Sequence, residues 1–459
     1  MTSRFTGDRA FNRRSVVKVG ATGAATAGLL AATRGMGLAS AQDASPAASP
    51  AGATSGFNTA GLKVSAPVEI EYWQYELASK TELVNQLIPE FQAANPGITV
   101  KHVNYPYDDF RQQVAAGVQA GEGPDVLNVY FGWVASYVQQ QFLTPLPADI
   151  FPNATIEADF YPTVQAAKIK DAYYALPIAV RTLALFYNKD MLDAAGVQPP
   201  TNWEELVEVA KATVKKDGEN FEAVGITWDI GGQQHNWWRE ALIRQNGALP
   251  SSEDNRTLQW TSPEGIEAFK YVAAFLTEYG VTQAGFQTDG PTAFAAGKAA
   301  LHIDGSYRVG SLAKDAPDLN YGVVPLPAHK EKASFASYWA NAITRKAAEG
   351  DRLIASAKFI DFLSSEAVQK RWTPAVGELP ARLALANDPV VTDNEKLAPF
   401  VESLPYSYAT FIVNEADLRQ SVMDAFDQVT LNGVDAEAAV QEAQDKNQAQ
   451  LDEYWAAFG

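Results

Sequence analysis

Residues 66–105 decide the fold and read APVEIEYWQYELASKTELVNQLIPEFQAANPGITVKHVNY. Apolar side chains alternate at Val68, Ile70 and Tyr72, which is the period of a β-strand, and helical spacing follows them. The helix is expected to end at the Asn-Pro-Gly sequence of residues 95–97, before a second strand. Another helix and the strand PDVLNVYF continue the pattern. This alternation predicts parallel β-α-β units and an open sheet with helices on both faces.

Aromatic residues stand where these three strands are expected to end. Ligands of open α/β sheets bind beyond the carboxyl ends of the strands. At those ends, or one or two residues beyond them, the sequence has Trp73, Tyr75, Tyr107, Tyr130 and Trp133. We therefore expect these side chains to face a ligand.

The rest of the chain is more helical. Thr201 and Glu204 have the spacing of a capping box, and Ser262 followed by Pro263 predicts the start of another helix. Residues 356–372 are amphipathic, and residues 435–458 look helical. Roughly 400 residues exceed one typical core, so two lobes are expected.

The first 41 residues have the composition of an export signal. Arg13 and Arg14 precede a weakly apolar stretch, and Ala39–Ala41 gives a small-x-small cleavage pattern. The paired arginines resemble a twin-arginine signal, which would export a folded protein. Residues 42–61 are rich in Ala, Ser, Pro and Gly and are expected to form a flexible linker.

Charge and composition exclude several classes of function. The formal net charge is −18, so the chain is expected to repel nucleic acid and anionic lipid. It has no cysteine, which excludes disulfides, thiolate metal sites and a lipid-bearing N-terminal cysteine. The four histidines form no zinc motif, and there is no P-loop, GxGxxG or GxSxG sequence. We expect no cofactor, no metal and no enzymatic activity.

Tryptophan is the residue that stands out. A flat ring beside carboxylate, amide or guanidinium groups suits a sugar, because the ring contacts its CH face while the polar groups bind its hydroxyls. Four tryptophans are expected to pack in the core or at the surface, namely Trp203, Trp260, Trp372 and Trp455. Five are expected to face a cleft, namely Trp73, Trp133, Trp237, Trp238 and Trp339.

Several stretches, taken in order, resemble the family 1 extracellular solute-binding proteins of ABC importers, the group that contains the maltose-binding proteins. They are FQAANPGITV, AGEGPDV, the block from Tyr173 to Leu206, AFAAGKAALHIDGSYRVG, YGVVPLPA and the region from Ser356 to Arg382. The resemblance implies two α/β lobes that close on a ligand like a hinge. It places one lobe at residues 62–177 and 340–377, and the other at 180–338 and 380–459. Chain crossings are then expected near residues 177–180, 338–340 and 377–380.

The resemblance also implies which residues contact the ligand. The matching positions are Trp73, Tyr75, Tyr107, Tyr130, Trp133, Arg181, Asp229, Trp237, Trp238, Asp304, Tyr307, Trp339 and Glu378. Arg181 departs from the maltose binders, which place a carboxylate just past the first crossing. That departure counts against maltose and could favour an acidic or phosphorylated ligand. For Asp229, Asp304 and Glu378, a structural role as a capping or turn acid is an equal alternative.

The expected function is that of an exported receptor, which captures a mono- or oligosaccharide and delivers it to the membrane permease of an ABC importer. It is expected to be a monomer in the periplasm or outside the cell, either released or tethered by an uncleaved signal. Alternatives are the same fold with a non-sugar solute (a sugar acid or phosphate, a polyamine or ferric ion) and a secreted carbohydrate-active enzyme.

Overall fold

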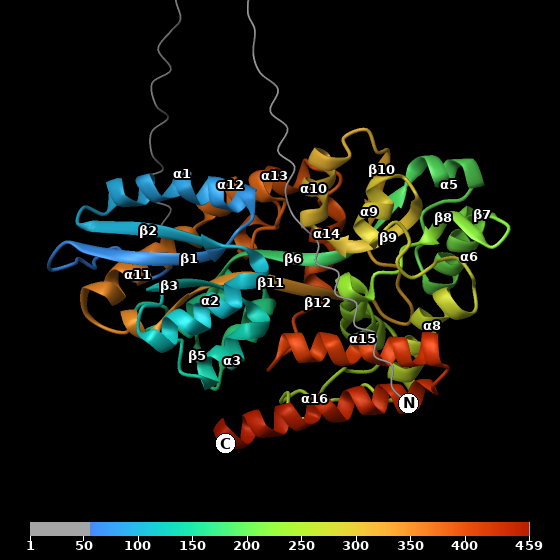
Figure 1. Cartoon of the computed structure of the whole chain (residues 1–459). Helices are drawn as coiled ribbons and strands as arrows, with labels where there is room; N and C mark the ends of the chain where they lie inside the picture. Colours follow the sequence, from blue (N-terminus) through green and yellow to red (C-terminus); the bar gives the residue numbers. More distant parts are fainter. Residues whose placement is uncertain (1–55, 459) are drawn as a thin grey trace, which may run out of the picture. The chain divides into compact units, whose positions relative to one another are not determined.

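A computed structural model describes residues 56–458, except the side chains of Tyr107, Asp108 and Phe458. Its main sheet follows the order β2-β1-β3-β11-β6-β9-β8-β7, with β10 paired to β6 and β12 paired to β11 (Figure 1). The strands are β1 (Val68–Tyr75), β2 (Ile98–Tyr105), β3 (Val126–Tyr130), β6 (Ala175–Asn188), β7 (Lys215–Asp217), β8 (Asn220–Ile226), β9 (Ala299–Gly305), β10 (Tyr321–Val324), β11 (Ser334–Ile343) and β12 (Ser407–Tyr408). A separate two-stranded sheet consists of β4 (Lys168–Ile169) and β5 (Ala172–Tyr173).

The first lobe is built around the parallel strands β1, β2 and β3, as the alternating sequence predicted. β1 and β2 pair in register from Val68 opposite Ile98 to Tyr75 opposite Tyr105. The apolar positions of α1 at Leu83, Leu87 and Phe91 are buried, which explains why this segment packs as a helix. The helices of this lobe are α1 (Ala78–Ala94), α2 (Tyr107–Ala120), α3 (Val134–Gln139), α4 (Asn153–Asp159), α11 (Gly350–Leu363) and α12 (Glu366–Val376).

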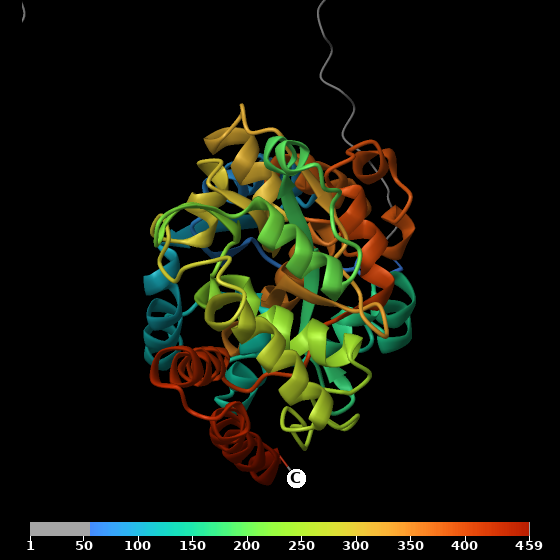
Figure 2. The same ribbon diagram turned by 90° about the vertical axis from the view of Figure 1, so that its right-hand side faces the viewer.

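The second lobe is built around β9, β8 and β7. The remaining helices of the described chain are α5 (Lys189–Ala195), α6 (Trp203–Thr213), α7 (Ile243–Gln245), α8 (Pro263–Thr277), α9 (Gly290–Ala295), α10 (Tyr307–Asp315), α13 (Pro389–Thr392), α14 (Ala398–Ser403), α15 (Glu415–Asn432) and α16 (Ala436–Phe458). Two π-helical segments, η3 (Ile230–Gln234) and η4 (Trp237–Leu242), precede α7. Figures 1 and 2 show α15 and α16 lying side by side.

Three chain segments lie side by side where the two lobes join. β6 pairs with β11 as far as Thr182, with β9 from Leu183 and with β10 from Leu185, so this one strand connects the two halves of the sheet. Val180 lies opposite Tyr338 of β11 and exchanges two backbone hydrogen bonds with Leu379, at 2.9 Å each. The register of β11 shifts between Trp339 and Ala340. One residue from each of the three expected crossings, Val180, Tyr338 and Leu379, therefore lies at this point.

The N-terminal part of the described chain packs on the first lobe. Phe57 is buried, and its ring lies 4.9 Å from that of Phe151. Thr59 is also buried and hydrogen-bonds the carboxylate of Asp361. The linker expected over residues 42–61 therefore overlaps a packed segment, because Phe57 is a large apolar residue that finds a place in the core. The signal expected over residues 1–41 lies outside the described residues.

Helix starts were predicted with mixed success. Ser262 caps α8 as expected and accepts a hydrogen bond from the Gly265 N–H. At α6 the prediction of Thr201 as N-cap was wrong, because Asn202 takes that position and accepts from the Glu205 N–H at 2.9 Å. The Glu205 carboxylate in turn accepts bonds from the Thr201 backbone and hydroxyl. The box is thus shifted by one residue.

Candidate functional site

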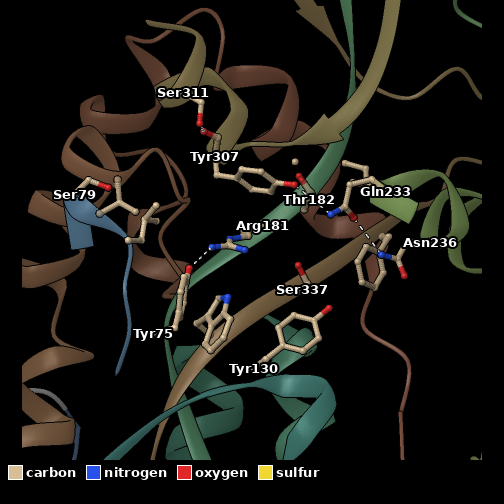
Figure 3. Close-up of a pocket in the computed structure, with 18 of the residues that line it drawn as sticks. Tyr75, Ser79, Tyr130, Arg181, Thr182, Gln233, Asn236, Tyr307, Ser311 and Ser337 are labelled. Carbon is tan, nitrogen blue, oxygen red and sulfur yellow. Dashed lines mark hydrogen bonds between the residues drawn. The ribbon is translucent and has the colours of Figure 1, made fainter. Parts of the chain in front are cut away.

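A cavity of about 620 Å³ lies beside the crossing strands. Tyr75, Tyr130 and Trp339 line it from the first-lobe end of the sheet (Figure 3). Gln233, Asn236 and Tyr307 line it from the second lobe. Tyr75 and Tyr130 are the last residues of β1 and β3, so the cavity lies where the open-sheet rule places a ligand.

The first-lobe wall is a cluster of aromatic rings. The ring centroids of Tyr75 and Trp339 are 4.1 Å apart, and those of Tyr130 and Trp339 are 5.7 Å apart. Trp133 stands behind them, edge-on to Trp339 at 5.3 Å. Trp133 is 2% exposed, so it supports the wall and does not form its surface. This packing holds the front rings in fixed orientations.

Arg181 projects from β6 into the cavity and is held by a buried carboxylate. Its Nε donates to Oε1 of Glu378 at 2.6 Å, and its Nη2 bonds the same oxygen and the hydroxyl of Tyr75. Lys80 on α1 lies 3.2 Å from Glu378 Oε1, and Trp372 Nε1 donates to Oε2 at 2.7 Å. The Glu378 carboxylate therefore connects both crossing segments to α1.

Neighbouring charges together have a larger effect than burial on the protonation states of Glu378 and Arg181. Burial alone would raise the pKa of Glu378, but the charges of Arg181 and Lys80 outweigh it and lower the pKa to about 2. In the same way, the charges of Glu378 and its neighbours outweigh burial and raise the pKa of Arg181. The guanidinium and the carboxylate are therefore both ionised at neutral pH.

The second-lobe wall is polar and is joined by hydrogen bonds. Asn236 Nδ2 donates to Gln233 Oε1 at 3.1 Å, and Gln233 Nε2 donates to the Tyr307 hydroxyl at 3.2 Å. That hydroxyl donates to Oδ1 of Asp304 at 2.6 Å. The guanidinium of Arg181 lies 4.8 Å from the centroid of the Tyr307 ring, so the two walls meet there.

The buried Asp304 holds this wall in place through its hydrogen bond with Tyr307. It is 2% exposed and accepts bonds from Arg308 Nε at 2.6 Å and from the Gly305 backbone at 2.7 Å. Burial acts to raise the pKa of Asp304, but His302, Arg308 and Tyr307 together lower it. A side chain at Gly305 would place its Cβ only 2.5 Å from the Tyr307 ring, which explains the glycine in this acid-Gly turn. The anchor thus fixes Tyr307 in place.

The structure brings five of the expected site residues to the cavity surface and places others behind it. Those at the surface are Tyr75, Tyr130, Arg181, Tyr307 and Trp339. Those in direct contact with surface residues are Trp133, Asp304 and Glu378. Of Tyr107 only the backbone is described, at the start of α2.

Four expected residues lie away from the cavity wall. Trp237 and Trp238 are 1% and 0% exposed, because η4 turns them into the helical core beside Phe275 and Phe269. Trp73 packs edge-on against Tyr105 on the sheet. Asp229 packs against Gly232 and Gly290, and its pKa is raised by burial, which outweighs the opposing effect of His302. None of the four is among the residues that line the cavity.

The cavity also contains residues that sequence reasoning missed. They are Ser79, Thr182, Gln233, Asn236, Ser337 and Arg419, among others. Gln233 and Asn236 belong to the polar stretch GGQQHN that precedes the paired tryptophans. That stretch was the available signal, since four polar side chains follow two glycines within six residues.

The described residues offer neither a metal centre nor a membrane span. Nowhere between residues 56 and 458 do three or more His, Asp or Glu side chains gather in a way that could hold an ion. In the same part of the chain, every helix is too short or too polar to cross a bilayer.

Comparison with known proteins gives a consistent picture. The sequence model of the bacterial extracellular solute-binding protein family matches residues 86–399. A maltotriose-binding protein of Pyrococcus abyssi is 25% identical over 347 residues, which cover 74% of this chain and 72% of that protein. A solute-binding protein of an ABC transporter from Thermotoga lettingae, solved with α-D-tagatose, has a TM-score of 0.72 at 22% identity. The alignment covers 83% of this chain and 99% of that one.

A second solved structure agrees on the fold. The cyclic α-maltosyl-1,6-maltose binding protein of Arthrobacter globiformis has a TM-score of 0.72 at 20% identity, over 84% of this chain and all of that one. The two lobes, the shared strands and the family match over more than half of the sequence lead to one conclusion: this chain belongs to the bacterial extracellular solute-binding proteins.

Proposed function

We propose that this protein is the extracytoplasmic receptor of an ABC importer and that it binds a mono- or oligosaccharide in the cavity beside the crossing strands. The observation that carries the proposal is the pairing of two unlike walls in one cavity. Tyr75, Tyr130 and Trp339 form an aromatic wall, and Gln233, Asn236 and Tyr307 form a polar one. Relatives that bind maltotriose or tagatose support the choice of a carbohydrate.

The two walls match the two kinds of surface on a sugar. Trp339 and Tyr130 present flat faces on which the CH groups of a pyranose can pack. Amide groups both donate and accept hydrogen bonds, so Asn236 and Gln233 suit adjacent hydroxyls, and Nη1 of Arg181 can donate to a further oxygen. The volume of about 620 Å³ lies within the ordinary range of small-molecule sites, roughly 300–1,000 Å³.

Binding is proposed to close the two lobes around the sugar. The lobes are proposed as residues 62–177 with 340–377 and residues 180–338 with 380–459, hinged where Val180, Tyr338 and Leu379 meet. A sugar that contacts only one wall competes with water, whereas closure adds the second wall and shifts the population to the closed form. The permease can then distinguish the loaded receptor from the empty one.

The same proposal places the protein outside the cytoplasmic membrane. Residues 1–41 supply the export signal, and the paired Arg13 and Arg14 favour the twin-arginine route. The protein acts as a monomer, free in the periplasm or extracellular space or tethered by an uncleaved signal. It releases the sugar unchanged, because it acts as a receptor and not as an enzyme.

A thermal-shift screen of residues 42–459 against mono- and oligosaccharides tests the proposal. A sugar that binds only the folded chain raises the melting temperature by mass action. We expect a shift with one sugar class, its loss in Trp339→Ala, and its retention in Trp455→Leu. Trp455 is the matched control because this residue of α16 packs on Phe411 and does not line the cavity. No shift with any carbohydrate, or consumption of the sugar, would refute the proposal.

A further inference from the structure

We propose that the bound solute carries an anionic group, a carboxylate or a phosphate, and that Arg181 and the first turn of α1 hold this group. The inference rests on the proposed function, in which this cavity holds the transported solute. The aromatic and polar walls do not determine the charge of that solute, and this inference concerns that charge.

The first argument is a charge imbalance beside the cavity. Lys80 and Arg181 both contact the one carboxylate of Glu378, at 3.2 Å and 2.6 Å. Lys80 is fully buried, Glu378 is 1% exposed and Arg181 is 16% exposed. Among the side chains that the structure describes, which do not include Asp108, neither cation has another carboxylate within ion-pair distance. Two cations and one anion leave a buried positive charge, which is costly unless an anion joins them.

Lys80 makes this excess a fixed property of the site. Its ammonium lies 4.7 Å from the ring centroid of Tyr75, 5.3 Å from that of Trp339 and 5.7 Å from that of Trp372. The rings attract the cation and hold it behind the aromatic wall. Water does not reach it, so its field is screened less than that of a surface lysine.

The second argument is the orientation of Arg181. Its Nε and Nη2 are engaged with Glu378 and Tyr75, as the dashed bond in Figure 3 shows for Tyr75. Its Nη1 has no hydrogen-bond acceptor among the described residues, although the side chain lines the cavity. Glu378 and Tyr75 thus hold the guanidinium in place while one donor group stays available to a ligand.

The third argument is the adjacent end of α1. This helix has 17 residues, and Leu77, Ala78 and Ser79 at its start line the same cavity. The N-cap Leu77 supplies no side-chain acceptor, and the first turn holds no acidic residue. The first N–H groups therefore carry the positive end of the helix dipole without a capping anion. Lys80 is in this same turn, so the helix end and the excess positive charge lie in the same part of the structure.

The other charges that line the cavity balance one another. Lys314 and Asp315 end α10, and Glu415 and Arg419 lie on α15. The buried Asp304 is paired with Arg308 at 2.6 Å. The excess positive charge therefore belongs to the end of the cavity formed by Arg181 and α1. This local positive charge is opposite in sign to the formal net charge of the whole chain, which is −18.

Isothermal titration calorimetry with matched ligand pairs tests the inference on residues 42–459. The probes are glucose with glucuronate and glucose 6-phosphate, galactose with galacturonate, and glycerol with sn-glycerol 3-phosphate. We expect an acidic member to bind at least about tenfold more tightly than its neutral parent. The carboxylate and phosphate arms distinguish the two sources of anionic oxygen. Spermidine is included because the positive end should reject it.

Two variants and one control then locate the charge. Lys80→Met removes a buried cation that does not line the cavity and should weaken the acidic probe about tenfold while sparing its neutral parent. Arg181→Gln should weaken the acidic probe further, and Arg181→Lys should recover part of the loss. The control Arg371→Gln removes a half-exposed cation of α12 that pairs with Glu90 of α1. It should change the affinity for neither the acidic probe nor its neutral parent. Circular dichroism confirms that each variant is folded.

The outcomes separate this inference from the proposed function. Equal or tighter binding of neutral sugars, or binding of spermidine, would overturn the anionic inference and leave a neutral-sugar or polyamine receptor. Equal loss of acidic and neutral probes in folded Lys80→Met would also overturn it, because a purely structural lysine would act on both. If a neutral sugar raises the melting temperature but no acidic probe binds, the anionic inference is overturned and the receptor proposal stands; if no carbohydrate of the thermal-shift screen raises it, the sugar-receptor proposal itself is refuted.

Discussion

Replacing Glu378 by glutamine should destabilise the protein in a way that depends on pH. The substitution keeps the shape of the side chain but leaves Arg181 and Lys80 buried without their shared anion. Removing one partner of a buried ion pair costs about 3–5 kcal/mol. The pKa of Glu378 gives a similar figure, since a fall from 4.5 to about 2 corresponds to about 3 kcal/mol.

The pH dependence follows from the sign of this shift. Because folding lowers the pKa of Glu378, its contribution is complete above pH 4.5 and is lost as the pH falls towards 2. The difference between wild type and Glu378→Gln should therefore be constant from pH 7 to pH 5. By pH 3.5 it should shrink by roughly 1 kcal/mol, as the unfolded carboxyl of the wild type takes up a proton.

Urea unfolding of both proteins at pH 7, 5 and 3.5 measures this difference. The control is Glu90→Gln, which removes a carboxylate from the exposed pair with Arg371 and should cost less than about 1 kcal/mol. A Glu378→Gln variant as stable as wild type at pH 7 would refute the reasoning. So would a stability difference that stays constant down to pH 3.5.

Three further results are expected. Trp339→Ala should weaken sugar binding by at least about tenfold, since it removes the central ring of the aromatic wall, and calorimetry with the ligand found by thermal shift measures it. Phe57→Ala should lower the free energy of unfolding by about 3–5 kcal/mol, because Phe57 is buried against Phe151; a change below 1 kcal/mol in urea unfolding would show that residues 57–61 do not pack as described. Burial lowers the pKa of His102 to about 4, so the unfolded chain takes up a proton first and His102 should lower stability by roughly 1 kcal/mol for each pH unit between pH 6.5 and 4; in the same assay, the stability of wild type relative to His102→Gln should fall by that amount, while the slope due to the buried His235 is common to both proteins.

Regular periodicity made the first lobe predictable. Alternating apolar residues in β1 and four-residue spacing in α1 each have one structural solution, and the structure shows both. Tyr75 and Tyr130, at the ends of β1 and β3, line the cavity, and their contact with a ligand stays a prediction. These elements depend on short stretches of sequence, which is why the sequence alone predicted them.

The wall of the second lobe was harder to predict, because its geometry is irregular. The chain from Ile230 to Leu242 contains two π-helical segments, Ile230–Gln234 and Trp237–Leu242, with Trp237 and Trp238 in the core and Gln233 and Asn236 at the cavity. No ordinary helical period indicates that orientation. The positions resembled those of the family, but the direction of each side chain depended on the local backbone.

Long-range pairing was the other limit. Arg181 and Glu378 are 197 positions apart, and each was expected to face the ligand. The structure joins them, so the carboxylate orients the guanidinium and only the guanidinium lines the cavity. The sequence predicted both residue types near the crossings, but the pairing depends on how β6 and the segment at Leu379 meet.

Calorimetric titration of residues 42–459 with the sugar that gives the largest thermal shift tests directly whether the cavity binds the solute. We expect one ligand per chain, a loss of binding in Trp339→Ala but not in Trp455→Leu, and recovery of the sugar unchanged. Equal binding by wild type and Trp339→Ala, or conversion of the sugar during the titration, would contradict a receptor that captures its solute in this cavity.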